Sequence, residues 1–398
     1  TVALDVDAVR ARFPALTQTV PDGAGGAVPV VHADAPGGTQ VTAGVIEAMA
    51  VYLRTANANS HGCFPASTAT DALVEEVRRK VAAFVGGHPA GIVFGPNMTT
   101  LTWHFSHALD ARVAPGDELV CTRLDHDANV SPWLALAGRT GATVRWVSLD
   151  PETGRLDMDT LDVSARTRLV AFPAASNALG TVVDSAPFVA AARSVGALTF
   201  CDAVHAAPHV PLDRAAAGID VLACSPYKFF GPHAGLLSAD PDLLAELRPD
   251  KVRPAPAAGP DRWQTGTAAF EAIAGVGAAL DHIAEFGMDA VVAHERTLTR
   301  RYLDGVAQLG HVTVHGPADE HARTPTFALT VRGHTPDQVA RTLAARGVNV
   351  WAGDYYAVEP MRALDLADRG GAVRVGFVHY HRPADVDRVL TLLADLAR

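Results

Sequence analysis

Lysine is the residue that this sequence lacks most clearly. The 398 residues include three lysines, Lys80, Lys228 and Lys251, against 30 arginines. The net charge is −10 and the basic residues form no run, which argues against nucleic acid or an anionic membrane surface as a partner. No apolar stretch reaches the length of a transmembrane helix, so we expect no membrane span. A lysine that this chain keeps in an apolar setting therefore calls for a chemical explanation.

Cysteine is scarce too, and four cysteines do not make a disulfide framework in a chain of this size. Cys121, Cys201 and Cys224 lie in apolar patterns typical of strands. Cys63 lies in a polar loop. The N-terminal residues are acidic and do not resemble a basic signal peptide. We therefore expect reduced thiols and a cytoplasmic location.

Strand-like and helix-like patterns alternate along most of the chain, which predicts an α/β fold with a mainly parallel sheet between helices. A stretch rich in Pro and Gly at 248–263 interrupts this pattern, and long helices follow it. The length allows two domains, which we place at 31–288 for the large one and at 1–30 with 289–398 for a smaller α+β one. The expected strands are 92–94, 118–122, 168–172, 197–201, 221–224, 234–239, 326–331 and 372–377; the expected helices are 98–109, from about 131, 186–194, 268–285, 289–307, 336–345 and 384–396.

Lys228 lies in an apolar and aromatic neighbourhood, between Ser225-Pro226-Tyr227 and two phenylalanines. Arginine keeps its proton, but a lysine removed from water can lose it and become a nucleophile that forms a Schiff base. Asp202 ends an earlier apolar strand, so both side chains are expected at the same edge of the sheet. This pair is what a pyridoxal 5'-phosphate (PLP) enzyme needs, with the lysine on the aldehyde and the aspartate on the pyridinium nitrogen. The alternatives are a lysine that reaches solvent and an aspartate that caps a turn.

A second segment suits the cofactor's phosphate. Gly95 to Thr100 follows a strand and opens a helix, so the first backbone amides of the helix, at Met98 and Thr99, can bind an anion. Simple capping of the helix by Asn97 or Thr99 is the alternative.

Taken together, these segments resemble the class V aminotransferase family, and within it the branch of cysteine desulfurases and selenocysteine lyases. The resemblance covers nearly the whole chain and rests on ordered motifs: His32 to Thr39, Asn57 to Gly62, Asp125 to Trp133, Ser176 to Gly180, Asp202 to His205, Ser225 to Lys228 and Thr265 to Thr267. It implies fold type I of the PLP-dependent transferases, with a seven-stranded type of sheet in the large domain. It also implies a homodimer whose two subunits share each active site.

The resemblance gives three residues catalytic roles: Lys228 carries PLP, His126 stacks on its ring and moves protons, and Asp202 keeps the ring nitrogen protonated. Asn177 would bond the phenolic oxygen. The remaining cofactor-binding residues implied are Met98, Thr99, His205, Ser225, Tyr227 and, from the other subunit, Thr267.

For the substrate, the resemblance implies that Arg374 grips the carboxylate of an amino acid as a two-pronged fork. The other substrate-binding residues that we expect are Asn59, Tyr355 and Tyr356. Packing at a dimer interface is the alternative for the aromatic cluster of Trp351 and the two tyrosines.

One departure from the family decides the expected reaction. Desulfurases carry an active-site cysteine on a late loop, but the matching stretch here, 351–357, contains none. Without a thiolate that loop cannot accept sulfur as a persulfide. We therefore expect β-elimination that cleaves the C–S bond of a bulky cysteine S-conjugate, in specialised sulfur metabolism such as lincosamide or ergothioneine pathways.

Other reactions of the same substrate class remain open: decarboxylation with oxidative deamination, transamination and epimerisation. An alternative from a different class is a metal-dependent hydrolase that uses Asp202, His205 and His209. Pro208 and Pro211 argue against a helix that presents both histidines on one face, so we expect no metal site.

Overall fold

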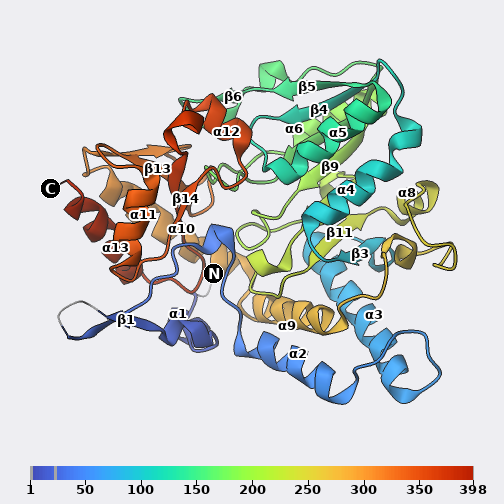
Figure 1. The fold of residues 1–398 in the computed structure, drawn as a ribbon, viewed down its shortest axis with the longest axis horizontal. Helices are drawn as coiled ribbons and strands as arrows, with labels where there is room; N and C mark the ends of the chain where they lie inside the picture. The colour runs from blue at the N-terminus through green and yellow to red at the C-terminus, as the bar shows by residue number, and fades with distance from the viewer. Residues whose placement is uncertain (1–2, 22–24, 398) are drawn as a thin grey trace.

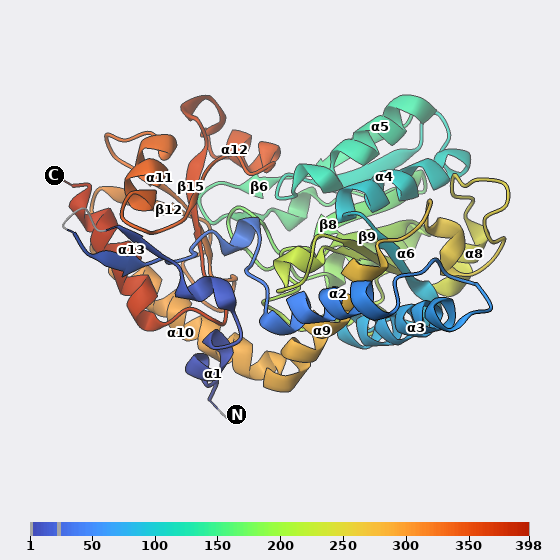
Figure 2. The same ribbon diagram turned by 60° about the horizontal axis from the view of Figure 1, so that its bottom comes forward.

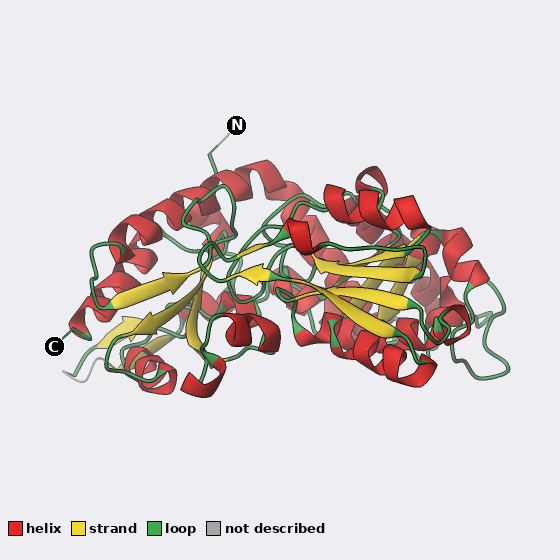
Figure 3. Cartoon of the chain, turned by 90° about the horizontal axis from the view of Figure 1, so that it is seen from above, coloured by secondary structure: helices red, strands yellow, loops and turns green. Residues whose placement is uncertain are grey.

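The computed structural model describes residues 3–21 and 25–397, which form two adjoining parts, each built around its own sheet. Figure 1 shows the larger part on the right and the smaller part, made mostly of C-terminal segments, on the left. The two parts lie side by side in the other views as well, so the molecule is elongated (Figures 2 and 3).

The large sheet has seven strands. Their order is β3 (Ile92–Gly95), β11 (Gly235–Ala239), β10 (Val221–Cys224), β9 (Leu198–Asp202), β8 (Thr167–Pro173), β4 (Glu118–Thr122) and β5 (Thr143–Val147). The five strands from β10 to β5 run parallel, whereas β11 is antiparallel to both of its neighbours. The expectation of a mainly parallel seven-stranded sheet is confirmed. Its strands β4 and β10 are buried along their whole length, and β8 is buried except at Arg168, in keeping with their apolar runs.

Helices cover both faces of this sheet (Figure 3). One apolar cluster joins the first face to α3 (Pro65–Val85), α6 (Ala186–Val195) and α9 (Phe270–Phe286). A second cluster joins the opposite face to α4 (Met98–Ala108), α5 (Ser131–Thr140) and α8 (Pro241–Glu246). Two further helices complete this part, α2 (Ala43–Thr55), which packs on α9, and the short α7 (Arg214–Ala217).

The smaller part is an antiparallel four-stranded sheet in the order β12 (Val312–His315), β13 (Thr326–Val331), β15 (Ala372–Gly376) and β14 (Trp351–Gly353). One apolar cluster ties the sheet to α10 (Met288–Val306), α11 (Pro336–Ala344) and α13 (Pro383–Asp395). The remaining elements are α1 (Val6–Arg10), α12 (Val358–Ala363) and the ribbons of β1 (Thr19–Pro21) with β2 (Ala27–Pro29) and of β6 (Leu149–Asp150) with β7 (Arg155–Leu156).

A single turn of 3-10 helix, Ala35–Gly37, joins the two parts. Asp34 forms a parallel bridge with Gly376 at the end of β15, and the Pro36 ring lies so close to Gly376 that a side chain at that glycine would collide with it. Trp351 of β14 covers Gly37, and its indole leaves no room for a Cβ atom there. The turn is therefore gripped by two strands of the small sheet.

The predicted elements agree with the observed ones to within two residues, but several observed elements were not expected, among them one strand and two helices of the large part. The edge strand β5 alternates exposed and half-buried residues, and α2 and α3 precede the first predicted strand. The domain boundary at 288/289 stays a prediction. None of the helices within the described residues combines the length and the hydropathy that a membrane crossing requires.

Candidate active site

A hollow lies beyond the carboxyl ends of β8, β9 and β10, where ligands gather in such sheets. Nine of the predicted site residues line it, and they come from the end of β9 and from the segments that follow β3, β4, β8, β9 and β10. Its lining consists of Asn97, Met98, Thr99, His126, Ala128, Pro173, Ala175, Asn177, Asp202, Val204, His205, Ser225, Tyr227 and Lys228. Most of the residues predicted to bind the cofactor therefore line one hollow, and their roles stay predictions.

Lys228 closes a short 3-10 turn directly after β10. Its Nζ donates a hydrogen bond to the Pro36 carbonyl and lies 5.0 Å from the centre of the Tyr227 ring. The pKa of Lys228 is lowered to about 7, mainly by burial and also by the nearby Arg374, while Asp202 opposes the shift. The amine is therefore partly neutral near neutral pH and can act as a nucleophile or a base.

Asp202 is the last residue of β9 and is 5% exposed. Burial raises the pKa of Asp202 to about 6, although the backbone N–H of Val204, which donates to its Oδ1 at 2.9 Å, and Lys228 both oppose the shift. A buried carboxylate of this kind gains from a cationic partner. The hollow thus presents an amine and a carboxylate whose pKa values are pushed toward each other.

His126 and His205 line the same hollow as neutral rings. Burial lowers the pKa of His126 to about 3, and its Nδ1 accepts a hydrogen bond from the Ala128 N–H at 3.0 Å, which leaves the proton on Nε2. Burial also holds the pKa of His205 well below its usual range, and its Nε2 lies 3.0 Å from Thr324 Oγ1. Both rings can therefore pack on an uncharged aromatic surface at neutral pH.

The helix α4 points its first turn into the hollow. Asn97 caps it by accepting the Thr100 N–H at 2.7 Å, so the capping alternative raised from the sequence is correct for Asn97. Met98 and Thr99, at the first two helical positions, still line the hollow together with Ser225 and Tyr227. A helix N-terminus with hydroxyl groups beside it suits a phosphate dianion.

Arg374 and the two tyrosines adjoin the hollow but do not line it. Arg374 Nη1 donates to the Asn177 carbonyl at 2.9 Å, and Asn177 Nδ2 donates to the Tyr355 carbonyl at 3.0 Å. Burial lowers the pKa of Arg374 to about 10, which still leaves the guanidinium charged at neutral pH. The Tyr356 ring lies 5.6 Å from the His126 ring. These residues form the rim of the hollow on the side of the small sheet.

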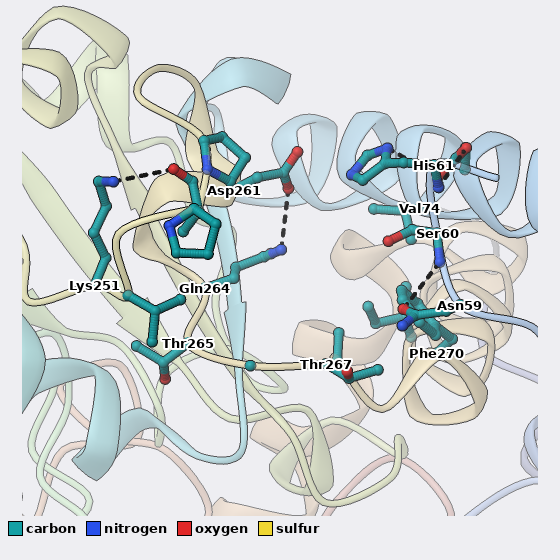
Figure 4. A pocket seen from close by; sticks show the side chains of 18 of the residues that line it. Asn59, Ser60, His61, Val74, Lys251, Asp261, Gln264, Thr265, Thr267 and Phe270 are labelled. Atoms are coloured by element: carbon teal, nitrogen blue, oxygen red, sulfur yellow. Dashed lines mark hydrogen bonds and ion pairs between the residues drawn. The ribbon is translucent and has the colours of Figure 1, made fainter.

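Asn59 and Thr267 lie elsewhere, in a second and larger hollow of about 600 Å³ between α3, α9 and the loop rich in Pro. Figure 4 shows them facing this space together with Lys251, Asp261, Gln264 and Phe270. Within one chain, neither residue meets Lys228 or Asp202. The roles of Thr267, expected to act on the other subunit, and of Asn59, expected to bind the substrate, stay predictions.

The two histidines of the hydrolase alternative lie beside each other, but each is paired with a different residue. His209 Nδ1 bonds the buried Glu295 at 2.8 Å, and its ring lies 5.1 Å from the His205 ring. Across residues 3–21 and 25–397, no three His, Cys, Asp or Glu side chains are arranged to hold a metal ion.

Sequence reasoning missed several neighbours that shape the site. The Pro36 carbonyl holds Lys228 from 192 residues away, and Thr324 reaches His205 from the small sheet. Asp34 lies near Arg374, and burial raises its pKa. Asp34 is part of the N-terminal motif that carries the resemblance, so that motif was the signal that could have found it.

The comparisons with known proteins agree with this geometry. The model of the family "Aminotransferase class-V" matches residues 31–389. The chain belongs to the class V aminotransferase family.

Within this family, similar curated proteins are named as cysteine desulfurases. A probable cysteine desulfurase 2 of Mycobacterium leprae is 32% identical, over 97% of this chain and 95% of its own length. A probable cysteine desulfurase of Streptomyces coelicolor is 31% identical, over 97% of this chain and 96% of its own length. In fold, the chain is similar to an apo cysteine desulfurase from Thermococcus onnurineus NA1, with a TM-score of 0.91, 24% identity and coverage of 100% and 98%.

This member of the class V aminotransferases is therefore a PLP-dependent enzyme of the cysteine desulfurase-like branch. The residues of the first hollow fit the cofactor. Lys228 supplies a buried amine of lowered pKa, Asp202 a buried carboxylate, and α4 an anion-binding helix end. The buried Oδ1 of Asn177 has no partner among the described residues, as expected of an amide that awaits a ligand.

The lowered pKa of Lys228 predicts the pH dependence of cofactor attachment. Only the neutral amine attacks an aldehyde, so the rate of PLP attachment to the apoenzyme should rise with pH, reach half of its maximum near the pKa of about 7 and level off above it. An ordinary lysine, of pKa about 10.4, would place that midpoint about three units higher. The rate is measured from the absorbance change at a series of pH values. A rate that keeps rising beyond pH 9 contradicts the expected pKa. Because Arg374 lowers the pKa of Lys228, Arg374→Gln should move the midpoint upward.

Proposed function

We propose that this enzyme cleaves the C–S bond of a bulky cysteine S-conjugate by β-elimination. The observation that carries the proposal is the position of the four thiols. Cys121, Cys201 and Cys224 are buried in strands and Cys63 is exposed in a loop, and none lines the hollow with Lys228. Burial raises the pKa of Cys121, Cys201 and Cys224, which keeps them as unreactive thiols. Elimination needs no enzyme thiolate, whereas persulfide transfer does.

The chain's own residues supply what elimination requires. When bound, PLP supplies an aldehyde for the substrate's amino group and a protonated ring that withdraws electrons from the α-carbon. Asp202 would keep that ring protonated, and the first turn of α4 would hold the phosphate. Arg374 would bind the substrate carboxylate as a fork. The neutral Lys228 amine would take the α-proton, the C–S electron pair would leave with sulfur, and the Lys228 ammonium would then protonate the thiolate. The released 2-aminoacrylate would react with water to give a keto acid and ammonia.

A test follows from the missing thiolate. Free L-cysteine should give little or no enzyme-bound persulfide, while a bulkier conjugate such as S-phenyl-L-cysteine should be consumed, with release of its thiol and a keto acid. Mass spectrometry of the protein and of the products measures both. A variant in which all four cysteines are alanine or serine should keep most of the activity. If Cys63→Ser alone abolished turnover while PLP remained bound, Cys63 would be the nucleophile and the elimination mechanism would be wrong.

We further propose that the enzyme works as a homodimer with a shared site, in which a second copy closes the hollow of Figure 4. Thr267 would then reach the phosphate of the partner. A homodimer of either variant, Lys228→Ala or Thr267→Val, has two incomplete sites. A hybrid dimer has one complete site, which combines Lys228 of one subunit with Thr267 of the other. Mixing the two should restore up to about one quarter of wild-type activity if subunits exchange freely. If the mixture is no more active than the two variants measured separately, Thr267 does not contribute to the site of the other subunit.

Release of a bulky thiol suits specialised sulfur metabolism such as lincosamide or ergothioneine pathways.

A further inference from the structure

The loop Asp354–Ala357, between β14 and α12, has an unusual backbone. Tyr355 and Tyr356 both adopt left-handed conformations, with φ of 54° and 57°. Bulky residues rarely adopt positive φ, and such conformations persist where the surroundings hold them firmly. Within the loop, Asp354 accepts hydrogen bonds from the Tyr356 N–H at 3.0 Å and from the Ala357 N–H at 2.7 Å.

Contacts with both parts of the molecule hold this loop. The Tyr355 carbonyl accepts from Asn177 Nδ2 at 3.0 Å, and the Tyr356 carbonyl accepts from the Asp127 N–H at 2.7 Å. The Tyr355 hydroxyl donates to the Ala372 carbonyl of β15. The loop is thereby fixed to the loops after β8 and β4 and to a strand of the small sheet.

The ring of Tyr355 faces Arg374. The guanidinium carbon lies 4.4 Å from the ring centre, which is a close cation–π contact. Arg374 is 4% exposed, its Nη1 donates to the Asn177 carbonyl at 2.9 Å, and its buried Nε has no partner among the described residues. One face and one nitrogen of the guanidinium are therefore fixed, while donors remain for a ligand.

We propose that Tyr355 is a positioning residue, whose ring fixes the Arg374 guanidinium in the orientation that receives the substrate's α-carboxylate. The inference rests on the proposed function, in which Arg374 binds that carboxylate. It assigns the strained backbone a purpose: the left-handed turn at Tyr355 lets its carbonyl meet Asn177 while its ring covers Arg374. Tyr355 then acts through Arg374 and does not touch the side group of the substrate.

Two ligands that differ only in the carboxylate test the proposal. L-Homophenylalanine is the carbon isostere of S-phenyl-L-cysteine and has no sulfur to lose, and 3-phenylpropylamine is the same molecule without the carboxylate. Equilibrium binding of each to the holoenzyme is measured by calorimetry. The ratio of the two Kd values reports the carboxylate contact alone.

Tyr355→Asn removes the ring and keeps a residue that tolerates the left-handed backbone. It should raise the Kd of L-homophenylalanine about tenfold, because the cation–π contact that holds Arg374 is lost. The Kd of 3-phenylpropylamine should change by less than about twofold. Tyr355→Phe keeps the ring and should retain the wild-type ratio. In an Arg374→Gln background, Tyr355→Asn should have no further effect, because a residue that acts through Arg374 is not additive with it.

Tyr356→Asn is the matched control, since Tyr356 shares the left-handed backbone but its ring is 71% exposed and lies beside His126. It should leave the ratio of the two Kd values unchanged, and a change equal to that of Tyr355→Asn would overturn the proposal. Equal weakening of both ligands by Tyr355→Asn, or additivity with Arg374→Gln, would overturn it as well. Tyr355→Leu carries the same expectations if the asparagine variant does not fold. Wild-type enzyme that binds both ligands equally would instead contradict the carboxylate role of Arg374, and with it the proposed function.

Discussion

Replacing Lys228 by alanine is expected to lower turnover by at least about a thousandfold while the protein still folds, because one side chain supplies both the nucleophile and the base. The Lys228 amine is buried and bonds the Pro36 carbonyl, and burying an amine costs stability. Alanine removes this cost and does not alter the strands, so the variant should fold. Turnover of an S-substituted cysteine measures the first effect, and circular dichroism measures whether the protein folds.

Lys80→Ala is the matched control for Lys228. Lys80 lies on α3 at the surface and pairs with Glu76 and Asp281, so its loss should leave turnover unchanged. Borohydride reduction of the wild-type enzyme followed by peptide mapping should find the cofactor on Lys228. Cofactor found on Lys80 or Lys251 would refute the assignment.

The second large effect is expected for Asp202→Asn. A carboxylate typically shifts the pKa of a neighbouring cation by about 1–3 units, so its loss should slow turnover by roughly tenfold to a thousandfold. The asparagine oxygen can still accept the Val204 N–H, which keeps the local backbone in place. Turnover and thermal unfolding of the apoenzyme, measured on the same preparation, separate the chemical effect from the structural one.

Stability should change in the opposite direction to activity. Burial raises the pKa of Asp202 to about 6, so the folded apoenzyme holds this proton more tightly than the unfolded chain does. Above pH 6 the Asp202 carboxylate must be buried as an anion, which costs stability. The free energy of unfolding of the apoenzyme therefore falls as the pH rises from the pKa of the unfolded chain through 6. At pH 8 the Asp202→Asn apoenzyme should unfold at no lower temperature than the wild type.

Asp220→Asn is the control for this substitution, because Asp220 lies at the amino end of β10 and accepts the Thr199 N–H and hydroxyl, both at 2.8 Å. It should reduce stability and leave turnover unchanged. Near-wild-type turnover of Asp202→Asn would remove Asp202 from the mechanism.

The fold was largely predictable because its central strands are apolar runs that end at polar residues. Such runs at 118–122 and 221–224 mark β4 and β10 to the residue. The edge strand β5 was not predicted, since it is half-exposed and Arg145 interrupts its apolar residues. The helix α3 does place Val74, Val77 and Val81 at helical spacing, so its signal was present and was not used.

The candidate site was predictable where a residue directly follows a strand, as Asp202 and Lys228 do. It was not predictable where the contact joins distant segments. The bond of Lys228 to Pro36 spans 192 residues, and that of Arg374 to Asn177 spans 197. Periodicity reports the local environment of a residue, but it does not report which loops meet.

The turn Ala35–Gly37 connects the cofactor lysine to the small sheet. Its Pro36 carbonyl accepts the Lys228 hydrogen bond, while Gly376 of β15 and Trp351 of β14 pack against the same turn. A shift of the small sheet would therefore drag the lysine's acceptor along with it. The hydrogen-bond acceptor of the reactive amine is thus placed by packing between the two sheets, so the position of the small sheet bears directly on the base.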